Sequence, residues 1–342
     1  MKNLSEFMVA LVAVLIFSCQ TKEKMLPSVT TFEGKLTVSQ GGFENFSNRI
    51  KDFATIETVN GDVLIKDFDE IYLSFLKNIK TINGNLEIID SKIINLDFFS
   101  SLESVSGNIR IEGNRNLISL KGLEKLKKAK GLTLNGNFGN GSFIDLVPIQ
   151  NIMLTETLNF CYLLNDSFPL FKNLNTLSSF FFIYQCDGIK NLKSFSNLTS
   201  IANCRMVVGL NDSLKSLEGL DNITSVGSAY IHINTRLETL KGLDNLKTVA
   251  GLFSIYSNPL KSISNLKNLN RVDTLELSYT ECDSLNGLEN LLTCKKLQIK
   301  SNPLLTNFCA LKPLFLANNA VEWHASYNLQ NPTIEDVKSN CQ

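Results

Sequence analysis

The feature that most constrains this chain is a repeat of 22 to 24 residues in its second half. Three consecutive units read LKSLEGLDNITSVGSAYIHINTR, LETLKGLDNLKTVAGLFSIYSNP and LKSISNLKNLNRVDTLELSYTEC, and LLTCKKLQIKSNPLLTNFCAL follows them. One phase of the repeat is marked by Asn211, Asn234, Asn258 and Asn302, with Thr280 in the slot before the last. A period of this length is typical of stacked coils, because one unit alone cannot bury its hydrophobic face.

Each unit contains the pattern apolar-x-apolar-x-x-Asn. The same frame continues upstream through Asn114 and Asn137 and through the apolar pairs Val63/Ile65, Leu86/Ile88 and Ile109/Ile111. Alternate side chains of a strand point to opposite faces, so we expect Leu297 and Ile299 in the core and Gln298 outside. The asparagine can turn inward and bond the backbone where the chain leaves the strand. The sequence therefore predicts an α/β-type repeat solenoid: a right-handed coil with a concave parallel sheet, a mostly irregular convex side and a capped C-terminus.

The repeat departs from this frame between Phe143 and Cys204. The interval from Asn137 to Asn165 stretches to 28 residues, so two registers that differ by one residue stay open. The outward residues of this stretch cannot be assigned from the sequence, although the run Phe180-Phe181-Phe182-Ile183-Tyr184 places aromatic residues within it. Farther upstream, short glycine-containing units read Val59-Asn60-Gly61, Ile82-Asn83-Gly84 and Val105-Ser106-Gly107.

On these units the chain resembles bacterial leucine-rich-repeat lipoproteins and, more distantly, the receptor L domain. The resemblance covers the segment from about Thr31 to Leu311. It implies the solenoid architecture and does not identify a ligand. The N-terminus fits it: Lys2 precedes an apolar stretch from Phe7 to Phe17, which at about ten residues is too short to span a bilayer and predicts a signal peptide.

The ending Ile16-Phe17-Ser18-Cys19 resembles the lipobox of bacterial lipoproteins. The resemblance implies that Cys19 receives the lipid and becomes the mature N-terminus; a cleaved signal with an incidental cysteine is the alternative. A residue other than Asp after Cys19 implies outer-membrane sorting, and the charged stretch that follows resembles that of surface-exported lipoproteins of Bacteroidetes-like bacteria. A periplasm-facing and a surface-exposed position both stay open. We therefore expect residues 1–18 to be a signal peptide, 19–30 a tether, 31–311 the solenoid and 312–342 a cap.

The C-terminal segment NFCALKPLFLANNAVEWHASYNLQNPTIEDVKSNCQ breaks the repeat, as a cap over the last open core face would. It contains a short predicted helix over Thr333–Ser339. Cys309 and Cys341 bracket it, and in an exported protein we expect a disulfide between them, with two free thiols as the alternative. Asn331-Pro332-Thr333 resembles the cap of the same bacterial family.

Neither composition nor motifs point to catalysis or a cofactor. The chain has 33 lysine and arginine residues and 33 aspartate and glutamate residues. Without an excess of basic residues, nucleic acid is not expected as a partner. Only two histidines occur, and no phosphate loop, metalloprotease helix motif or serine elbow is present. No C-x-x-C spacing suggests a metal site, and we expect small buried core residues at Cys161, Cys186, Cys204, Cys282 and Cys294.

The outward positions of the strands form the candidate binding surface. In the repeat frame they are Arg110, Tyr230, His232, Ser254, Tyr256, Glu276 and Gln298. Aromatic residues on adjacent coils are typical of binding hot spots, although tyrosines that merely cover a sheet give the same pattern. We expect a non-catalytic envelope protein that binds a protein or a glycan through this face. A structural or adhesive protein without a dedicated ligand is the first alternative, and a hydrolase on a repeat scaffold the second.

Overall fold

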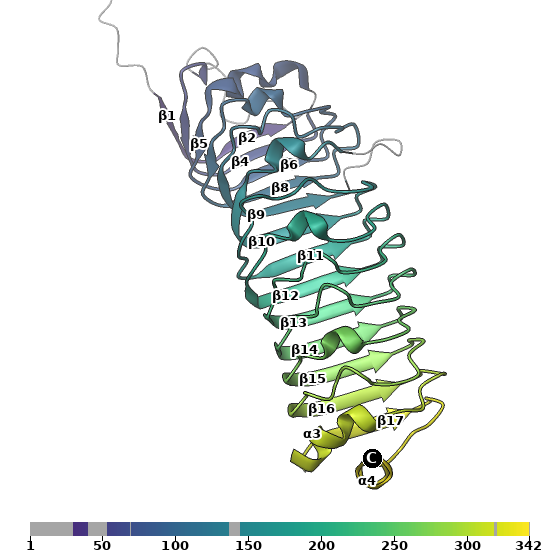
Figure 1. The fold of residues 1–342 in the computed structure, drawn as a ribbon. Helices are drawn as coiled ribbons and strands as arrows, with labels where there is room; N and C mark the ends of the chain where they lie inside the picture. The colour runs from purple at the N-terminus through teal and green to yellow at the C-terminus, as the bar shows by residue number, and fades with distance from the viewer. Residues whose placement is uncertain (1–29, 40–52, 69, 137–143, 318–319, 342) are drawn as a thin grey trace, which may run out of the picture.

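The computed structural model describes residues 30–39, 53–68, 70–136, 144–317 and 320–341. They wind as one elongated solenoid whose strands pair in parallel and stack into one long sheet (Figure 1). The main row of the sheet consists of β2 (Leu36–Ser39), β4 (Val63–Lys66), β6 (Leu86–Ile89), β8 (Asn108–Glu112), β9 (Lys128–Asn135), β10 (Met153–Cys161), β11 (Phe180–Tyr184), β12 (Ile201–Gly209), β13 (Ser225–His232), β14 (Thr248–Tyr256), β15 (Arg271–Ser278), β16 (Thr293–Lys300) and β17 (Glu322–Ser326). The predicted leucine-rich-repeat solenoid with a parallel sheet is confirmed.

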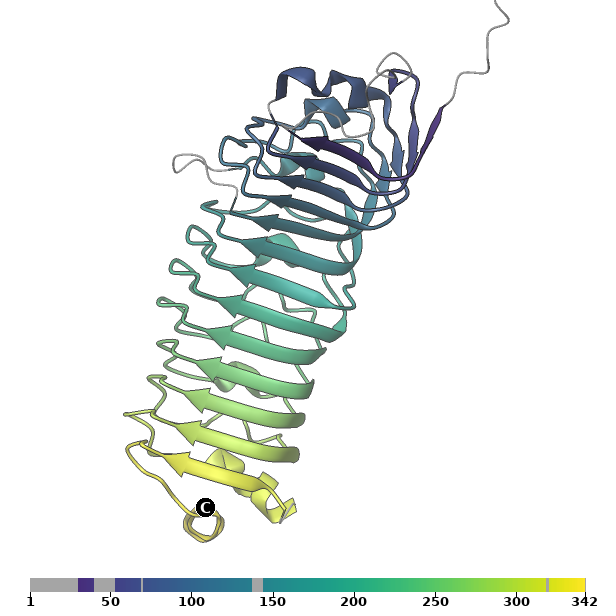
Figure 2. The same cartoon turned by 180° about the vertical axis from the view of Figure 1, so that it is seen from behind.

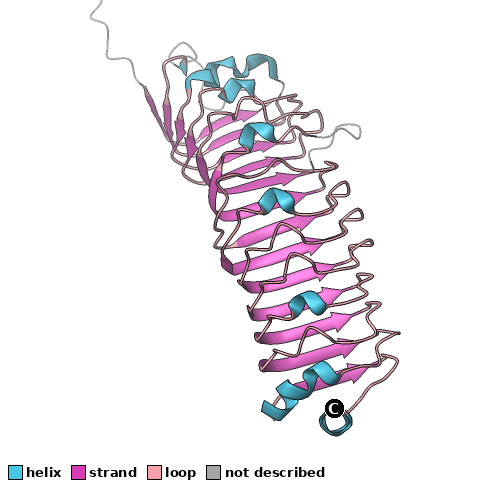
Figure 3. Ribbon diagram, viewed as in Figure 1, coloured by secondary structure: helices cyan, strands magenta, loops and turns pink. Residues whose placement is uncertain are grey.

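Shorter elements complete the coils. A second row of strands, β1 (Thr31–Glu33), β3 (Thr58–Asn60), β5 (Thr81–Ile82) and β7 (Ser104–Val105), lies beside the first coils. The return paths carry the 3₁₀ helices η1 (Glu70–Asn78), η2 (Asp97–Phe99), η3 (Val147–Ile149), η4 (Lys193–Phe195), η5 (Ser264–Leu266) and η6 (Cys309–Leu311), with α3 (Lys312–Ala317) and α4 (Ile334–Asn340) at the C-terminal end. The short helices cover one side of the sheet (Figure 3). The opposite side is open along its length and is called the sheet face below (Figure 2).

The core lies between the sheet and the return paths. Leu297 and Ile299 are fully buried while Gln298 between them is partly exposed, as the alternation predicts. The leucines of the return path close the core from the other side and are also fully buried: Leu220, Leu243, Leu266, Leu288 and Leu311. Because the core runs on from coil to coil, each unit is stabilised by its neighbours.

A ladder of buried asparagines joins the coils. The Oδ1 atom of Asn234 accepts a hydrogen bond from the backbone N–H of Asn211 at 3.1 Å. The Nδ2 of Asn234 donates to the Val208 carbonyl and to Oδ1 of Asn258, each at 3.0 Å. Thr280 occupies its predicted slot and donates from its hydroxyl to Asn302 Oδ1 at 2.8 Å. The ladder therefore satisfies backbone groups that the turns leave unpaired inside the core.

Cys186 also occupies a ladder slot. Its backbone N–H donates to Oδ1 of Asn211 at 2.9 Å, and its thiol donates to the carbonyl of Phe160 at 3.4 Å. The backbone bond to Asn211 does not depend on the side chain, whereas the thiol keeps the side-chain donor to the preceding coil. A thiol is thus a weaker but geometrically adequate substitute for the carboxamide.

The prediction that Asn165 marks the stretched repeat is wrong. The residue before each slot has a positive φ, as at Ile233 (54°) before Asn234, and the corresponding residue of the irregular coil is Tyr162 (57°). The slot therefore belongs to Leu163, which is buried. Asn165 lies two residues farther on and exchanges two hydrogen bonds with the backbone of Ile144, at 2.7 and 3.4 Å. Asn137 lies outside the described residues.

Glycines set the close approach of successive coils. Gly219, Gly242 and Gly287 have φ values of 115°, 109° and 114°, in the region that favours glycine. A Cβ atom on Gly242 would lie 2.1 Å from the backbone oxygen of Leu217 in the preceding coil. No side chain fits there without separating the two coils, which explains why glycine precedes the return-path leucine in these units.

The sequence predicts that the C-terminal segment breaks the repeat, and this prediction is wrong. Its strand β17 pairs in parallel with β16 and sets Trp323 beside Leu297, while Asn328 continues the ladder by accepting from the Asn302 backbone at 3.0 Å. The predicted helix is present as α4, and Thr333 caps it through a reciprocal capping box with Asp336. The expected disulfide between Cys309 and Cys341 is also present. The last coil is therefore a modified repeat with a stapled helix.

The predicted signal peptide, Cys19 and the predicted tether up to residue 29 fall outside the described residues. Within the part of the chain that the structure describes, no helix is both long and apolar enough to cross a bilayer.

Candidate ligand-binding face

The strand register resolves the sheet face into three rows of outward residues. The middle row contains Arg110, Thr133, Asn159, Phe182, Val207, Tyr230, Ser254, Glu276 and Gln298. The row on the C-terminal side contains Asn135, Cys161, Tyr184, Gly209, His232, Tyr256, Ser278 and Lys300. The row on the N-terminal side contains Gly131, Thr157, Phe180, Arg205 and Ser228, with Leu252, Thr274 and Lys296 farther along.

The structure brings most of the predicted binding residues together. Tyr230 pairs with Ser254 and His232 pairs with Tyr256 on the adjacent strands β13 and β14. Glu276 and Gln298 continue the middle row on β15 and β16. Arg110 is separate, because it lies on β8, where its guanidinium forms an ion pair with Glu112. That these residues bind a ligand remains a prediction.

Aromatic side chains gather on the strands between β10 and β15. We call this group the aromatic patch; it comprises Tyr162, Phe180, Phe182, Tyr184, Tyr230, His232, Tyr256 and Tyr279. Ring centroids lie 5.4 Å apart for Phe182 and Tyr184 and 5.2 Å apart for Tyr256 and Tyr279. Phe180 is 44 % exposed and Tyr279 54 %. Clusters of large aromatic residues that stay exposed to solvent are typical of contact surfaces.

Gly209 joins the two halves of this patch. It holds an outward position on β12 between Tyr184 and His232, and a Cβ there would lie 2.9 Å from Nε2 of His232. The missing side chain lets the imidazole lean across β12, so that its ring centroid lies 6.1 Å from that of Tyr184. Burial lowers the pKa of His232, so the ring is neutral near pH 7 and adds no charge to the patch.

A pocket of about 330 Å³ opens at the upstream edge of the patch. It is lined by Thr157, Asn159, Phe180, Phe182 and Arg205. The guanidinium carbon of Arg205 lies 4.5 Å from the ring centroid of Tyr230, which is a cation–π contact. Of these residues only the phenylalanine run was noticed in the sequence, and Arg205, Thr157 and Asn159 were missed. The signal for Arg205 is its spacing from the ladder. Arg205 precedes Asn211 by six residues, just as the outward residue Ser228 precedes Asn234 by six.

The patch carries almost no charge. In the three rows from β9 to β14 the only lysine, arginine, aspartate or glutamate is Arg205. Charged residues resume on the flanks, at Arg110 and Glu112 on one side and at Glu276, Lys296 and Lys300 on the other. The sheet face thus has a charge-poor aromatic centre and a charged border.

The remaining cysteines offer no reactive or metal-binding site. Five are free and buried: Cys161, Cys186, Cys204, Cys282 and Cys294. All of them except Cys161 lie in the hydrophobic core, as predicted. Burial raises the pKa of Cys186 to about 12, so its thiol stays protonated at neutral pH. Cys161 holds an outward position yet is 8 % exposed. Among the described residues no group of three or more histidine, cysteine or acidic side chains could hold a metal ion.

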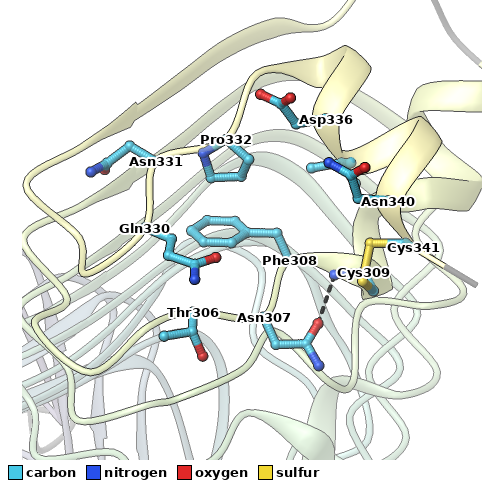
Figure 4. A pocket seen from close by; sticks show the side chains of 11 residues that line it. Thr306, Asn307, Phe308, Cys309, Gln330, Asn331, Pro332, Asp336, Asn340 and Cys341 are labelled. Carbon is cyan, nitrogen blue, oxygen red and sulfur yellow. Dashed lines mark hydrogen bonds between the residues drawn. A yellow bond between two sulfur atoms is a disulfide. The ribbon is translucent and has the colours of Figure 1, made fainter.

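A second pocket, of about 500 Å³, lies between the last coil and α4 (Figure 4). Phe308 and Pro332 face each other across it, with the Cys309–Cys341 disulfide at one end. Its carboxylate, Asp336, already accepts hydrogen bonds from the hydroxyl and the backbone N–H of Thr333. The pocket is therefore the gap beneath a packed cap, without an unpaired charge to recognise a ligand.

No protein-family model matches the sequence, and neither does any curated protein. Solved structures that match include the protein chain of a TLR13–ssRNA13 complex, with 13 % sequence identity and a TM-score of 0.28. The match covers 91 % of this chain and 63 % of that chain, so the present chain spans less than two thirds of its length. The strand register and the asparagine ladder of this chain itself define the fold.

Proposed function

We propose that the protein is a non-catalytic lipoprotein of a bacterial cell envelope that binds a protein partner through the aromatic patch. The observation that carries the proposal is the charge-poor aromatic centre around Arg205, set within a charged border. Cores of protein interfaces are depleted in charge and enriched in aromatic residues and arginine, while their rims are polar. A glycan is the second candidate, favoured by hydrogen-bonding side chains such as Thr157 and Asn159 beside the aromatic rings.

The rigidity of the scaffold supports a binding role. Outward residues project from strands whose backbone is held by the ladder and by the buried core, so little ordering is needed when a partner docks. Several of the aromatic side chains pack against each other, as Tyr162 does with Tyr184 at 6.5 Å between ring centroids. A preorganised aromatic surface loses little conformational entropy on binding.

Partner binding is expected to depend on Tyr230 and Tyr256. Full-length protein in detergent is used to isolate and purify its partner, and the Kd is then measured for Tyr230→Ala/Tyr256→Ala. We expect the affinity to fall by at least about 30-fold, equivalent to about 2 kcal/mol, because tyrosines that become buried on binding contribute strongly to interface energetics. Tyr327→Ala is the matched control, since Tyr327 is 83 % exposed and lies outside the aromatic patch. An unchanged Kd in the double variant would show that the partner does not bind through the aromatic patch, and failure to capture any partner would favour the structural or adhesive alternative.

Envelope attachment is expected to depend on Cys19. Cells fed labelled palmitate should label the wild-type protein and leave Cys19→Ala unlabelled, because the cysteine supplies the atom that carries the lipid. Two or more acyl chains hold a protein stably on a bilayer, so the variant should also move to the soluble fraction. Protease treatment of whole cells reports whether the anchored protein is exposed at the surface. An unlabelled wild-type protein would rule out the lipoprotein proposal.

A further inference from the structure

We propose that the Arg205 pocket binds a carboxylate of the partner, carried by an aspartate or glutamate side chain next to an apolar residue. This inference rests on the proposed function and deepens it, because it names the chemistry that the aromatic patch recognises.

Arg205 lacks the partner that a surface arginine usually has. Its backbone N–H donates to the Ser179 carbonyl at 2.9 Å, which fixes the strand. Its side chain is exposed and stacks over Tyr230, and within the described ranges its guanidinium forms no hydrogen bond and no ion pair. Stacking occupies a face of the planar group and leaves its N–H edges available to a ligand.

The other cations of the three rows between β8 and β17 are already engaged. Arg110 pairs with Glu112, and Lys296 pairs with Glu322 at 2.7 Å. The ammonium of Lys300 donates to the side-chain oxygen of Gln298 at 3.3 Å. Arg205 is thus the cation of this surface that a ligand can engage without breaking a contact within the protein.

The surroundings of Arg205 favour one anionic group with an apolar neighbour. Phe180 and Phe182 supply apolar walls, and a partner that covers them excludes water and strengthens the attraction between opposite charges. The side-chain oxygen of Asn159 accepts from the thiol of Cys161 at 3.0 Å, which leaves the amide N–H groups free to donate. A carboxylate in the pocket can therefore accept from Arg205, and Asn159 lines the same pocket with its amide donors.

The pocket suits a polypeptide better than a carbohydrate. Its volume of about 330 Å³ is at the small end of the range for ligand sites and fits one or two side chains. Its two phenylalanines have no polar atom, whereas each hydroxyl group of a buried sugar needs a hydrogen-bond partner. An acidic side chain flanked by Leu or Phe matches both the lone cation and the apolar walls.

The test uses fluorescent peptides with Phe-Asp-Leu and Phe-Glu-Leu cores, paired with Phe-Asn-Leu and Phe-Gln-Leu controls of the same shape. Anisotropy titrations with the full-length protein should show the acidic peptides binding at least about tenfold tighter than the amides, since charge-assisted bidentate hydrogen bonds are the strong ones. Arg205→Gln should abolish this preference, and Arg205→Lys should retain only part of it. Lys296→Gln, on the same row, should leave it unchanged.

Three results would overturn the inference: equal binding of acidic and amide peptides, binding of none of the peptides, or binding of a uronic-acid oligosaccharide instead. A thermal melt of Arg205→Gln that matches wild type shows that any loss is not a folding defect. If Tyr230→Ala/Tyr256→Ala weakens partner binding while Arg205→Gln does not, the inference fails and the proposed function stands. If neither variant changes partner binding, both fail.

Discussion

Replacing Asn234 with alanine is expected to lower the free energy of unfolding by about 3–5 kcal/mol, because each buried polar group left without a partner costs about 1–3 kcal/mol. The variant removes the acceptor of the Asn211 backbone N–H and the donor to the Val208 carbonyl. Both groups are deep in the ladder, where water cannot replace the carboxamide. The change therefore damages two coils at once.

Asn245→Ala is the matched control, since the exposed side chain of Asn245 makes one hydrogen bond, to the Asp221 carbonyl at 2.8 Å. We expect it to cost about 1 kcal/mol or less. Urea denaturation followed by circular dichroism compares the two variants. Hydrogen exchange of β12 to β14 locates the defect, because solenoids can unfold locally. Similar small losses in both variants would contradict a structural role for the ladder.

Removing the Cys309–Cys341 disulfide is the second change with a large expected effect. The two cysteines are separated by 32 residues, and closing a loop of that length is worth about 3–4 kcal/mol in the chain-entropy account. Cys309→Ser/Cys341→Ser should therefore release α4 and uncover the last coil, where Trp323 packs against Phe308 and Phe315 at 6.1 and 5.3 Å between ring centroids.

Limited proteolysis and thermal melting with and without dithiothreitol measure this effect. The wild-type protein should become cleavable near α4 and melt earlier when reduced, whereas the double serine variant should not respond to the reductant. The variant is thus its own control for other effects of dithiothreitol. A reduced wild-type protein that melts and resists proteolysis like the oxidised one would show that packing alone holds the cap.

The regular coils could be predicted from the sequence because each unit shows the same alternation. Leu297 and Ile299 are separated by the polar Gln298, so a period of two residues is visible and sets the inward and outward faces. The same reasoning placed Tyr230 and His232 correctly on the sheet face. The ladder asparagines then fixed the register from coil to coil.

The Arg205 pocket could not be read in the same way because its strands are apolar on both faces. Phe180 to Ile183 is one unbroken apolar run, and Met206-Val207-Val208 is another, so the alternation that separates inside from outside disappears. A leucine in the ladder slot at Leu163 removed the second marker. The proposed binding function would leave this signature, since an apolar outward face that recognises a partner also hides the register.

The last coil was missed for a different reason. Its ladder asparagine, Asn328, follows Asn302 by 26 residues, because α3 is inserted into the return path between β16 and β17. Trp323 also replaces the aliphatic residue expected at the inward position. The last coil therefore differs from the others both in its length and in the size of its inward side chain. For this reason its sequence could not be aligned with the repeat.

The residues of the three outward rows and the residues that stabilise the solenoid are different sets. Neighbouring strands lie about 4.8 Å apart, so the outward side chains of successive coils are regularly spaced along the sheet. The interior leucines, asparagines and close-packed glycines determine this spacing. They are buried and do not contribute to the outer surface. Where neighbouring outward side chains do not touch, one can change without moving the next, so the surface can vary coil by coil while the molecular frame stays the same.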